Sequence, residues 1–168
     1  TYDFQVLEID AEEIDAVNIS STKIRKAIKT GDIKLAQRYL GEPFELHGKI
    51  IEGQSLGRQI GFPTANLDLE SVIKLIPSPG VYAVNVLLSS GKIYEGMMNI
   101  GKRPTVSIHN NLSLEVHLFN FSGDLYNQHI TVQLLFRLRD EIKFDSIFDL
   151  TEQLKKDEES IRDYFING

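Results

Sequence analysis

The sequence predicts a mainly β fold: a small closed barrel of antiparallel strands, with short helices before it and one helix after it. Three observations predict this order. Helical patterns with capping residues occupy residues 19–41, apolar residues alternate with period two between 44 and 139, and helical spacing returns after 146. Five or six strands joined by short loops suit a barrel, because closing the sheet removes exposed strand edges.

Two short helices are expected at the start. Hydroxyl residues open the first one over 20–31, and Gly31 closes it. The second repeats this plan, with Asp32 as its cap and Gly41 as its end. Pro43 prevents further helix.

The strands are recognised by alternation. In 130–139, apolar residues take every second position, and in 112–119 Leu114 and Val116 share one face while Glu115 lies on the other. A Ser-Ser-Gly turn joins two further apolar runs, as in a hairpin. The expected strands cover 44–51, 80–88, 92–101, 112–119 and 130–139.

The C-terminal helix is expected to begin at a capping box formed by Ser146 and Asp149. Its apolar face is interrupted by the charged residues 155–159, and we expect the helix to pack against the barrel. That face consists of Ile147, Leu150, Leu154, Ile161 and Phe165.

Composition excludes several classes of protein. The 168 residues suit one domain, or one domain plus a fragment of another. The net charge of −6 argues against a dedicated nucleic-acid-binding protein. The absence of cysteine excludes disulfides and thiolate zinc sites, and no apolar run is long enough for a membrane span. We therefore expect a cytoplasmic protein with no membrane partner.

The stretch GQSLGRQIGFPTAN, at 53–66, carries the chemistry. It is not a Walker loop, because no Gly-Lys-Ser/Thr follows its glycines. Glycine nevertheless lets backbone N–H groups approach an anion, and Arg58 offers a fork suited to phosphate. If the chain is extended after Pro63, Thr64 and Asn66 point the same way, and their oxygens suit Mg²⁺ shared with phosphate. The alternative is a hairpin loop in which these two residues form turn hydrogen bonds.

With its flanks, HGKIIEGQSLGRQIGFPTANL (47–67) resembles the riboflavin kinase family. The resemblance continues through GVYAV, NIGKRPT, LEVHLF, DLY and LRDEIKFDSIFDL, and it covers about residues 42–165. Residues 19–41 resemble the end of the adenylyltransferase module of bifunctional bacterial riboflavin kinase/FAD synthetases. The resemblance implies residues 1–41 as the remnant of that module and 42–168 as the kinase domain, the C-terminal half of a longer protein.

The resemblance also implies a six-stranded barrel and a reaction. The γ-phosphate of ATP passes to the 5′-hydroxyl of riboflavin, giving FMN and ADP. Thr64 and Asn66 would hold Mg²⁺, and Glu115 would be the catalytic base. The alternative for a strand glutamate is that it merely faces water. The matching ATP positions are Gly53, Ser55, Gly57, Arg58, Gly61, Phe62, Pro63, Thr64, Leu118, Asn120 and Tyr126.

Flavin contacts are implied for Arg139, Glu141 and Phe144. The alternatives are that Phe144 is a hydrophobic staple and Arg139 a charge at a strand end. Binding of flavin or nucleotide without catalysis is the second hypothesis for the whole barrel, and a nucleic-acid-binding barrel, opposed by the negative charge, is the third.

The hydroxyl-rich opening of the first helix could bind an anion, as it helps to bind ATP in the adenylyltransferase module of the full-length family. The His-x-Gly-His motif of that module is absent from the sequence. We therefore expect no adenylyltransferase activity from this chain alone. The positions concerned are Ser20, Ser21, Thr22 and Arg25.

Overall fold

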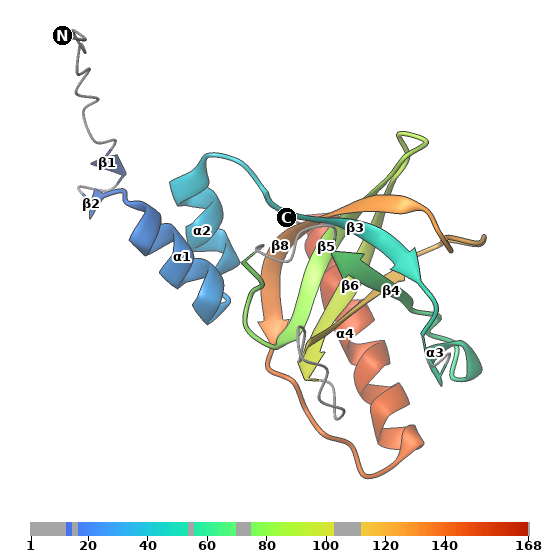
Figure 1. Ribbon diagram of the computed structural model, residues 1–168. Helices are drawn as coiled ribbons and strands as arrows, with labels where there is room; N and C mark the ends of the chain where they lie inside the picture. The colour runs from blue at the N-terminus through green and yellow to red at the C-terminus, as the bar shows by residue number, and fades with distance from the viewer. Residues whose placement is uncertain (1–12, 15–16, 54–55, 70–74, 103–111, 168) are drawn as a thin grey trace, which may run out of the picture.

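Six strands close into an antiparallel barrel in the order β3–β4–β7–β6–β5–β8 (Figure 1). The computed structural model describes residues 13–14, 17–53, 56–69, 75–102 and 112–167. The barrel strands are β3 (Phe44–Ile51), β4 (Ala65–Leu69), β5 (Gly80–Leu88), β6 (Ile93–Lys102), β7 (Leu112–Leu118) and β8 (His129–Arg139). The predicted closed barrel is confirmed, and its strand bounds agree with the alternation to within about a residue.

The other elements are β1 (Glu13–Ile14), β2 (Val17–Asn18), α1 (Ser21–Thr30), α2 (Ile33–Leu40), α3 (Leu56–Gln59) and α4 (Ile147–Asn167). β1 pairs with β2 in a separate two-stranded sheet. None of the described helices is long and apolar enough to cross a membrane.

The barrel interior is filled by the apolar residues that alternate along each strand. Tyr82, Leu46 and Val116 are fully buried there. Because successive side chains of a strand point to opposite faces, their neighbours in sequence lie on the outside of the barrel. The outer side chains of β7, namely Ser113, Glu115 and His117, are therefore free to form a site.

α1 and α2 begin and end as their caps predict. The Ser20 hydroxyl accepts a hydrogen bond from Lys23 N at 3.4 Å, and an Asp32 carboxylate oxygen accepts one from Leu35 N at 3.1 Å. Gly31 and Gly41 end the two helices with φ of 79° and 75°, in the left-handed region that favours glycine.

This helical hairpin packs directly on the barrel. Ile33 is 1% exposed and belongs to the same buried cluster as the barrel interior. Gln37 Nε2 donates a hydrogen bond to Leu134 O at 2.5 Å. The Lys34 ammonium lies 5.2 Å from the ring centre of Phe136, so α2 is joined to β8 by both polar and apolar contacts.

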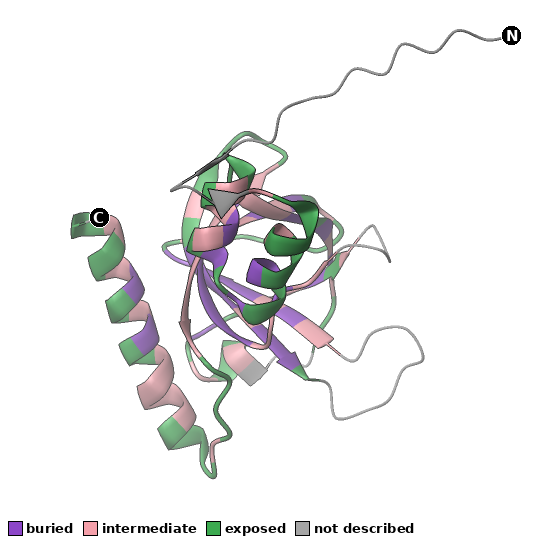
Figure 2. Ribbon diagram, turned by 90° about the vertical axis from the view of Figure 1, so that its left-hand side faces the viewer, coloured by how far each residue is buried: buried purple, intermediate pink, exposed green. Residues whose placement is uncertain are grey.

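α4 lies along the outside of the barrel, with its buried side turned toward the strands (Figure 2). Half of its predicted capping box is present: Asp149 N donates to the Ser146 hydroxyl at 3.1 Å, but Asp149 Oδ2 accepts from that hydroxyl, at 2.6 Å. One member of the predicted apolar face is wrong: Ile147 is 58% exposed, since the first turn extends beyond the barrel. The charged stretch contains an unexpected buried residue, Asp157, at 2% exposure.

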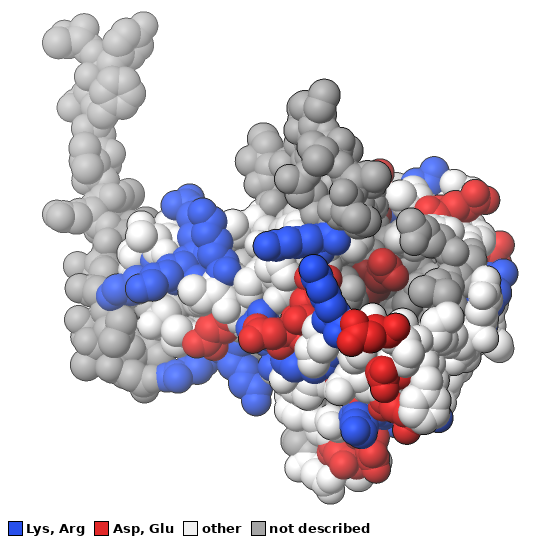
Figure 3. Space-filling view, turned by 90° about the horizontal axis from the view of Figure 1, so that it is seen from below, with Lys and Arg blue, Asp and Glu red and all other residues white. Residues whose placement is uncertain are grey.

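Charge is unevenly distributed over the face shown in Figure 3. Basic side chains predominate over α1 and α2, whereas basic and acidic side chains are interspersed over the rest of this face. The helices contribute Lys23, Arg25, Lys26, Lys29, Lys34 and Arg38.

Candidate active site

The strand register places three polar side chains in one row on the outside of the barrel. Asn66 of β4 is the register partner of Glu115 of β7, and Glu115 is in turn the partner of Asn99 of β6. The next pair along, Ala65 with Val116, faces the core. Thr64 and Asn66 therefore lie on the same side of their strand as Glu115 does on its own.

Thr64 and Glu115 are in contact. The Thr64 hydroxyl donates a long hydrogen bond of 3.4 Å to Glu115 Oε2. Thr64 lines both of two cavities, whereas Glu115 lines only the second. The Thr64 hydroxyl thus lies at the boundary between two binding spaces, in contact with a carboxylate of the second.

The first cavity has a volume of about 270 Å³. One wall comes from the chain around Arg58, Pro63 and Thr64, and the other comes from the β7–β8 connection at 121–126. Apolar residues of the barrel interior form its floor. Arg58 is exposed at its edge, so a positive charge is available to a ligand in this cavity.

The second cavity has a volume of about 200 Å³ and lies between the outer face of the barrel and the first half of α4. Its polar lining residues are Thr64, Asn99, Glu115, His117, Arg139 and Glu141. Its walls are otherwise largely apolar, which suits a flat aromatic ligand with a few polar atoms. The apolar residues are Ile60, Phe62, Val81, Met97, Ile142, Phe144, Leu150 and Leu154.

The glycine-rich loop fits closely around these groups. A Cβ on Gly53 would overlap the side-chain amide of Asn66, and one on Gly57 would overlap the Phe62 carbonyl oxygen. Phe62 N donates to Gly57 O at 2.8 Å, which closes the turn that α3 begins. Gly61 has φ of 84°, a conformation that favours glycine.

His117 holds the end of this loop. It is 8% exposed, and its Nδ1–H donates to the Pro63 carbonyl oxygen at 2.8 Å. Its ring lies between those of Phe62 and Phe119, with centroids 5.4 and 5.8 Å away. The peptide group that precedes Thr64 is therefore fixed by a buried side chain from β7.

Comparison with known proteins gives consistent results. The riboflavin kinase (flavokinase) family model matches residues 40–165. The chain is 47% identical, over 152 residues, to the bifunctional riboflavin kinase/FMN adenylyltransferase of Haemophilus influenzae, covering 90% of this chain and 48% of that protein. This chain belongs to the riboflavin kinase family. It spans about half the length of the curated relatives that it matches.

Two solved structures show the same fold. Riboflavin kinase from Trypanosoma brucei superposes with a TM-score of 0.54 and 26% identity, covering 74% of this chain and 78% of that one. A structure titled macrolide-efflux protein, from Streptococcus pneumoniae, superposes with a TM-score of 0.83 and 38% identity, covering 92% of this chain and 50% of that one.

Five of the eleven residues that the riboflavin kinase resemblance implied for ATP line the first cavity. They are Arg58, Pro63, Thr64, Leu118 and Tyr126. Those implied for the flavin, Arg139, Glu141 and Phe144, all line the second cavity instead. The two sets overlap at the second cavity, because Gly57, Phe62 and Thr64 of the ATP set also line it, and Thr64 lines both cavities.

Other implied positions lie elsewhere. Asn120 lines neither cavity, has φ of 55° and accepts a hydrogen bond from Arg162 Nη2 at 3.3 Å. Ser55 lies outside the described residues. The α1 positions Ser20, Ser21, Thr22 and Arg25 line neither cavity, and Ser20 is used as the helix cap.

The donor set around Thr64 fits a magnesium ion. The hydroxyl of Thr64 and the amide oxygen of Asn66 are hard neutral ligands, and Glu115 adds one carboxylate nearby. No group of three or more His, Cys, Asp or Glu side chains suited to a metal occurs among the described residues. So few protein ligands suit Mg²⁺ that also takes phosphate oxygens and water, rather than a metal held by protein alone.

Sequence reasoning missed some residues of the second cavity. Asn99 is not among the positions that the resemblance implies for the flavin, yet it lines the cavity and is the register partner of Glu115. Met97, on β6, and Ile142, in the connection between β8 and α4, were not predicted, because single apolar residues look like ordinary packing. The sequence indicates these two residues only indirectly, because apolar side chains on the outside of a barrel have to be covered by another group.

Proposed function

We propose that this chain is a riboflavin kinase, which transfers the γ-phosphoryl group of ATP to the 5′-hydroxyl of riboflavin and yields FMN and ADP. The observation that carries the proposal is the Thr64–Glu115 contact at the boundary of two cavities. A reaction between two substrates needs a catalytic group where their binding spaces meet.

ATP binds in the first cavity and riboflavin in the second. The first offers the Arg58 guanidinium to phosphates, together with the exposed ring of Tyr126. The second offers apolar walls and the ring of Phe144 to the isoalloxazine, with Glu141 and Asn99 for its polar atoms. The ribityl chain then reaches toward Thr64 and Glu115.

In the reaction, the 5′-oxygen of riboflavin forms a bond to the γ-phosphorus as the bond from that phosphorus to the β,γ-bridging oxygen breaks. ADP leaves with the electron pair of the broken bond. The Glu115 carboxylate accepts the hydroxyl proton. Phosphoryl transfer depends mainly on position and on neutralised charge, so a carboxylate, a donor-rich loop and Arg58 are an adequate set.

Thr64 and Asn66 would hold Mg²⁺, which when bound neutralises charge on the phosphate oxygens. Gly53 and His117 keep these two ligands in place, one by leaving room for the Asn66 amide and the other by fixing the Pro63 carbonyl.

We also propose that residues 1–41 are the end of an adenylyltransferase module in a longer cytoplasmic protein, with the kinase domain at 42–168. Two findings support this proposal. The relatives are named as bifunctional proteins, and this chain covers about half of their length.

The competing hypothesis is a barrel that binds flavin or nucleotide without turnover. Glu115→Gln separates the two. We expect kcat for ADP release in the presence of riboflavin to fall by about 100- to 10,000-fold, because the hydroxyl proton loses its acceptor. Riboflavin affinity, measured by flavin fluorescence, should persist, since the amide keeps the shape of the side chain.

Glu95→Gln is the matched control, because Glu95 is an exposed acid on β6 that lines neither cavity. Its turnover should equal that of the unaltered chain. If Glu115→Gln retained full turnover, Glu115 would not be the base. If the unaltered chain bound riboflavin but released no ADP, the proposed kinase activity itself would be wrong.

A further inference from the structure

Asp157 is a buried carboxylate outside the proposed catalytic group. It is 2% exposed, and it occupies a core-facing position of α4, one turn from Leu154 and from Ile161. Burial of a charge is expensive unless it is paired and hydrogen-bonded. Asp157 therefore points to a specific partner.

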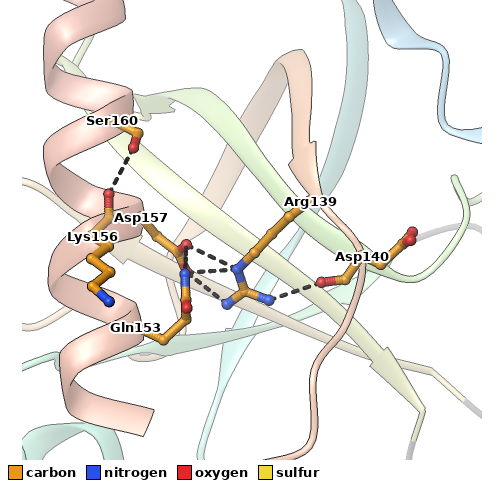
Figure 4. Close-up of polar contacts among 6 residues, drawn as sticks. All are labelled: Arg139, Asp140, Gln153, Lys156, Asp157 and Ser160. Carbon is orange, nitrogen blue, oxygen red and sulfur yellow. Dashed lines mark hydrogen bonds and ion pairs between the residues drawn. The ribbon is translucent and has the colours of Figure 1, made fainter. Parts of the chain in front are cut away.

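That partner is Arg139, the last residue of β8 (Figure 4). Arg139 Nε donates to Asp157 Oδ1 and Oδ2 at 2.9 and 3.0 Å, and Nη2 donates to Oδ2 at 2.6 Å. Gln153 Nε2 donates to Asp157 Oδ1 at 2.9 Å. Two-point pairing fixes the direction of the guanidinium as well as its distance.

Arg139 also holds the chain that follows it. Its Nη1 donates to the Asp140 carbonyl oxygen at 2.8 Å. The next residues, Glu141, Ile142 and Phe144, form one wall of the second cavity, and Leu150 and Leu154 of α4 form another. The ion pair thus links the two walls between which the flavin is proposed to bind.

Other contacts keep α4 on the barrel. Ile161 is fully buried against it, and the Tyr164 ring lies 4.5 Å from that of Phe136. These contacts lie toward the C-terminal end of the helix, away from the cavity. The Arg139–Asp157 pair is therefore a local support for the cavity walls in addition to its part in docking α4.

We propose that Asp157 is a positioning residue for the flavin, acting through Arg139, and this inference rests on the proposed function. Because its charge is paired with Asp157, the Arg139 guanidinium has a fixed orientation in the cavity wall and does not act as an unpaired cation. A guanidinium has five N–H groups. Asp157 and Asp140 take Nε–H and one N–H on each of Nη1 and Nη2, so the remaining two can be offered to the ring edge.

Asp157→Asn tests this role. The amide has nearly the same shape, but it loses the charge and one of the two acceptors. We expect the KM and Kd for riboflavin to rise by about 10- to 100-fold, because the ring is no longer held in its productive position. The KM for ATP should remain unchanged, since the first cavity does not touch this pair.

Glu152→Gln is the matched control. Glu152 lies on the same helix and pairs with Lys155 at 2.8 Å, but both side chains are exposed and line neither cavity. Its riboflavin KM should equal that of the unaltered chain.

Gln153→Ala is the second test, because it removes one hydrogen-bond donor to Asp157 and leaves the Arg139–Asp157 ion pair in place. It should raise the riboflavin KM by a smaller factor than Asp157→Asn does.

A merely structural pair would lower the melting temperature and leave both KM values alone. Either folded variant, Asp157→Asn or Gln153→Ala, with an unchanged riboflavin KM and Kd would overturn the inference. If the unaltered chain phosphorylates riboflavin, the proposed function stands whatever these variants show. If it only binds riboflavin, the Kd series still decides the role of Asp157.

Discussion

Gly53 shows how a single methyl group can decide the geometry of the site. The Cβ of any other residue would overlap the Asn66 amide, so the Asn66 side chain would have to leave its present position. We expect Gly53→Ala to raise the Mg²⁺ concentration needed for half-maximal riboflavin phosphorylation by about 10- to 100-fold, a range typical of altered support for metal ligands. A magnesium titration at saturating riboflavin measures this.

Gly41→Ala provides the comparison. Gly41 has φ of 75° with open space around its Cβ position, so alanine there strains the backbone without touching the site. It should lower stability and leave the magnesium requirement as it was. An unchanged magnesium titration for a folded Gly53→Ala variant would mean that Asn66 is not a ligand.

The sequence carried enough information to group Thr64 with Asn66, because two residues on one side of an extended segment must point the same way. The same argument placed Glu115 opposite Val116, which the structure buries in the core. Asp157 could not be found in this way. A charged residue on an apolar stripe normally interrupts it, and only its pairing with Arg139 explains why it is buried.

Among the elements, those with strong local signals were predicted well. α1 and α2 have hydroxyl or carboxylate caps and glycine ends, and β7 and β8 have clear alternation. α3 was not predicted, because a single turn within a glycine-rich loop has neither apolar spacing nor a cap. β4 was predicted only as an extended segment, since its five residues are too few to show a period.

The α1–α2 hairpin supplies a side chain to the core of the barrel. Ile33 is 1% exposed and packs in the same cluster as Leu46 and Leu134. We expect Ile33→Ala to lower the free energy of unfolding by about 2–5 kcal/mol, the usual effect of truncating a fully buried aliphatic side chain. Urea unfolding followed by circular dichroism measures the change.

Leu40→Ala, at the end of the same helix, is the reference. Leu40 is 37% exposed, so its truncation removes less buried surface and should have a clearly smaller effect. Equal effects for the two variants would show that the hairpin does not contribute to the core of the barrel.

Across the whole molecule, the site depends on strand pairings that are remote in sequence. Ala65 pairs with Val116, and the first strand of the barrel, β3, pairs with the last, β8. Alternation identifies which face of each strand is buried, but it does not say which strands are neighbours or in what register. The resemblance to the riboflavin kinase family supplied the six-stranded barrel, whereas the strand order and the register that joins Asn66, Glu115 and Asn99 came from the structure.

The packing also predicts that the hairpin and the barrel unfold together. Phe44 contacts both the cluster inside the hairpin and the cluster inside the barrel, and Gln37 bonds to the backbone of β8. Elements that share a core open in one cooperative step. We expect the best-protected amides of α1 and α2 to exchange hydrogen only through global unfolding, like those of β5 and β8.

Hydrogen exchange in increasing, sub-denaturing urea tests this at each amide. Exchange through global unfolding gives the same free energy and the same steep urea dependence in helices and strands, because the whole core is exposed. Ile33→Ala should lower both sets of values by equal amounts, since the side chain belongs to the shared core. If the opening free energy of the helix amides were lower than that of the strands and independent of urea, the hairpin would open by itself while the barrel stays folded.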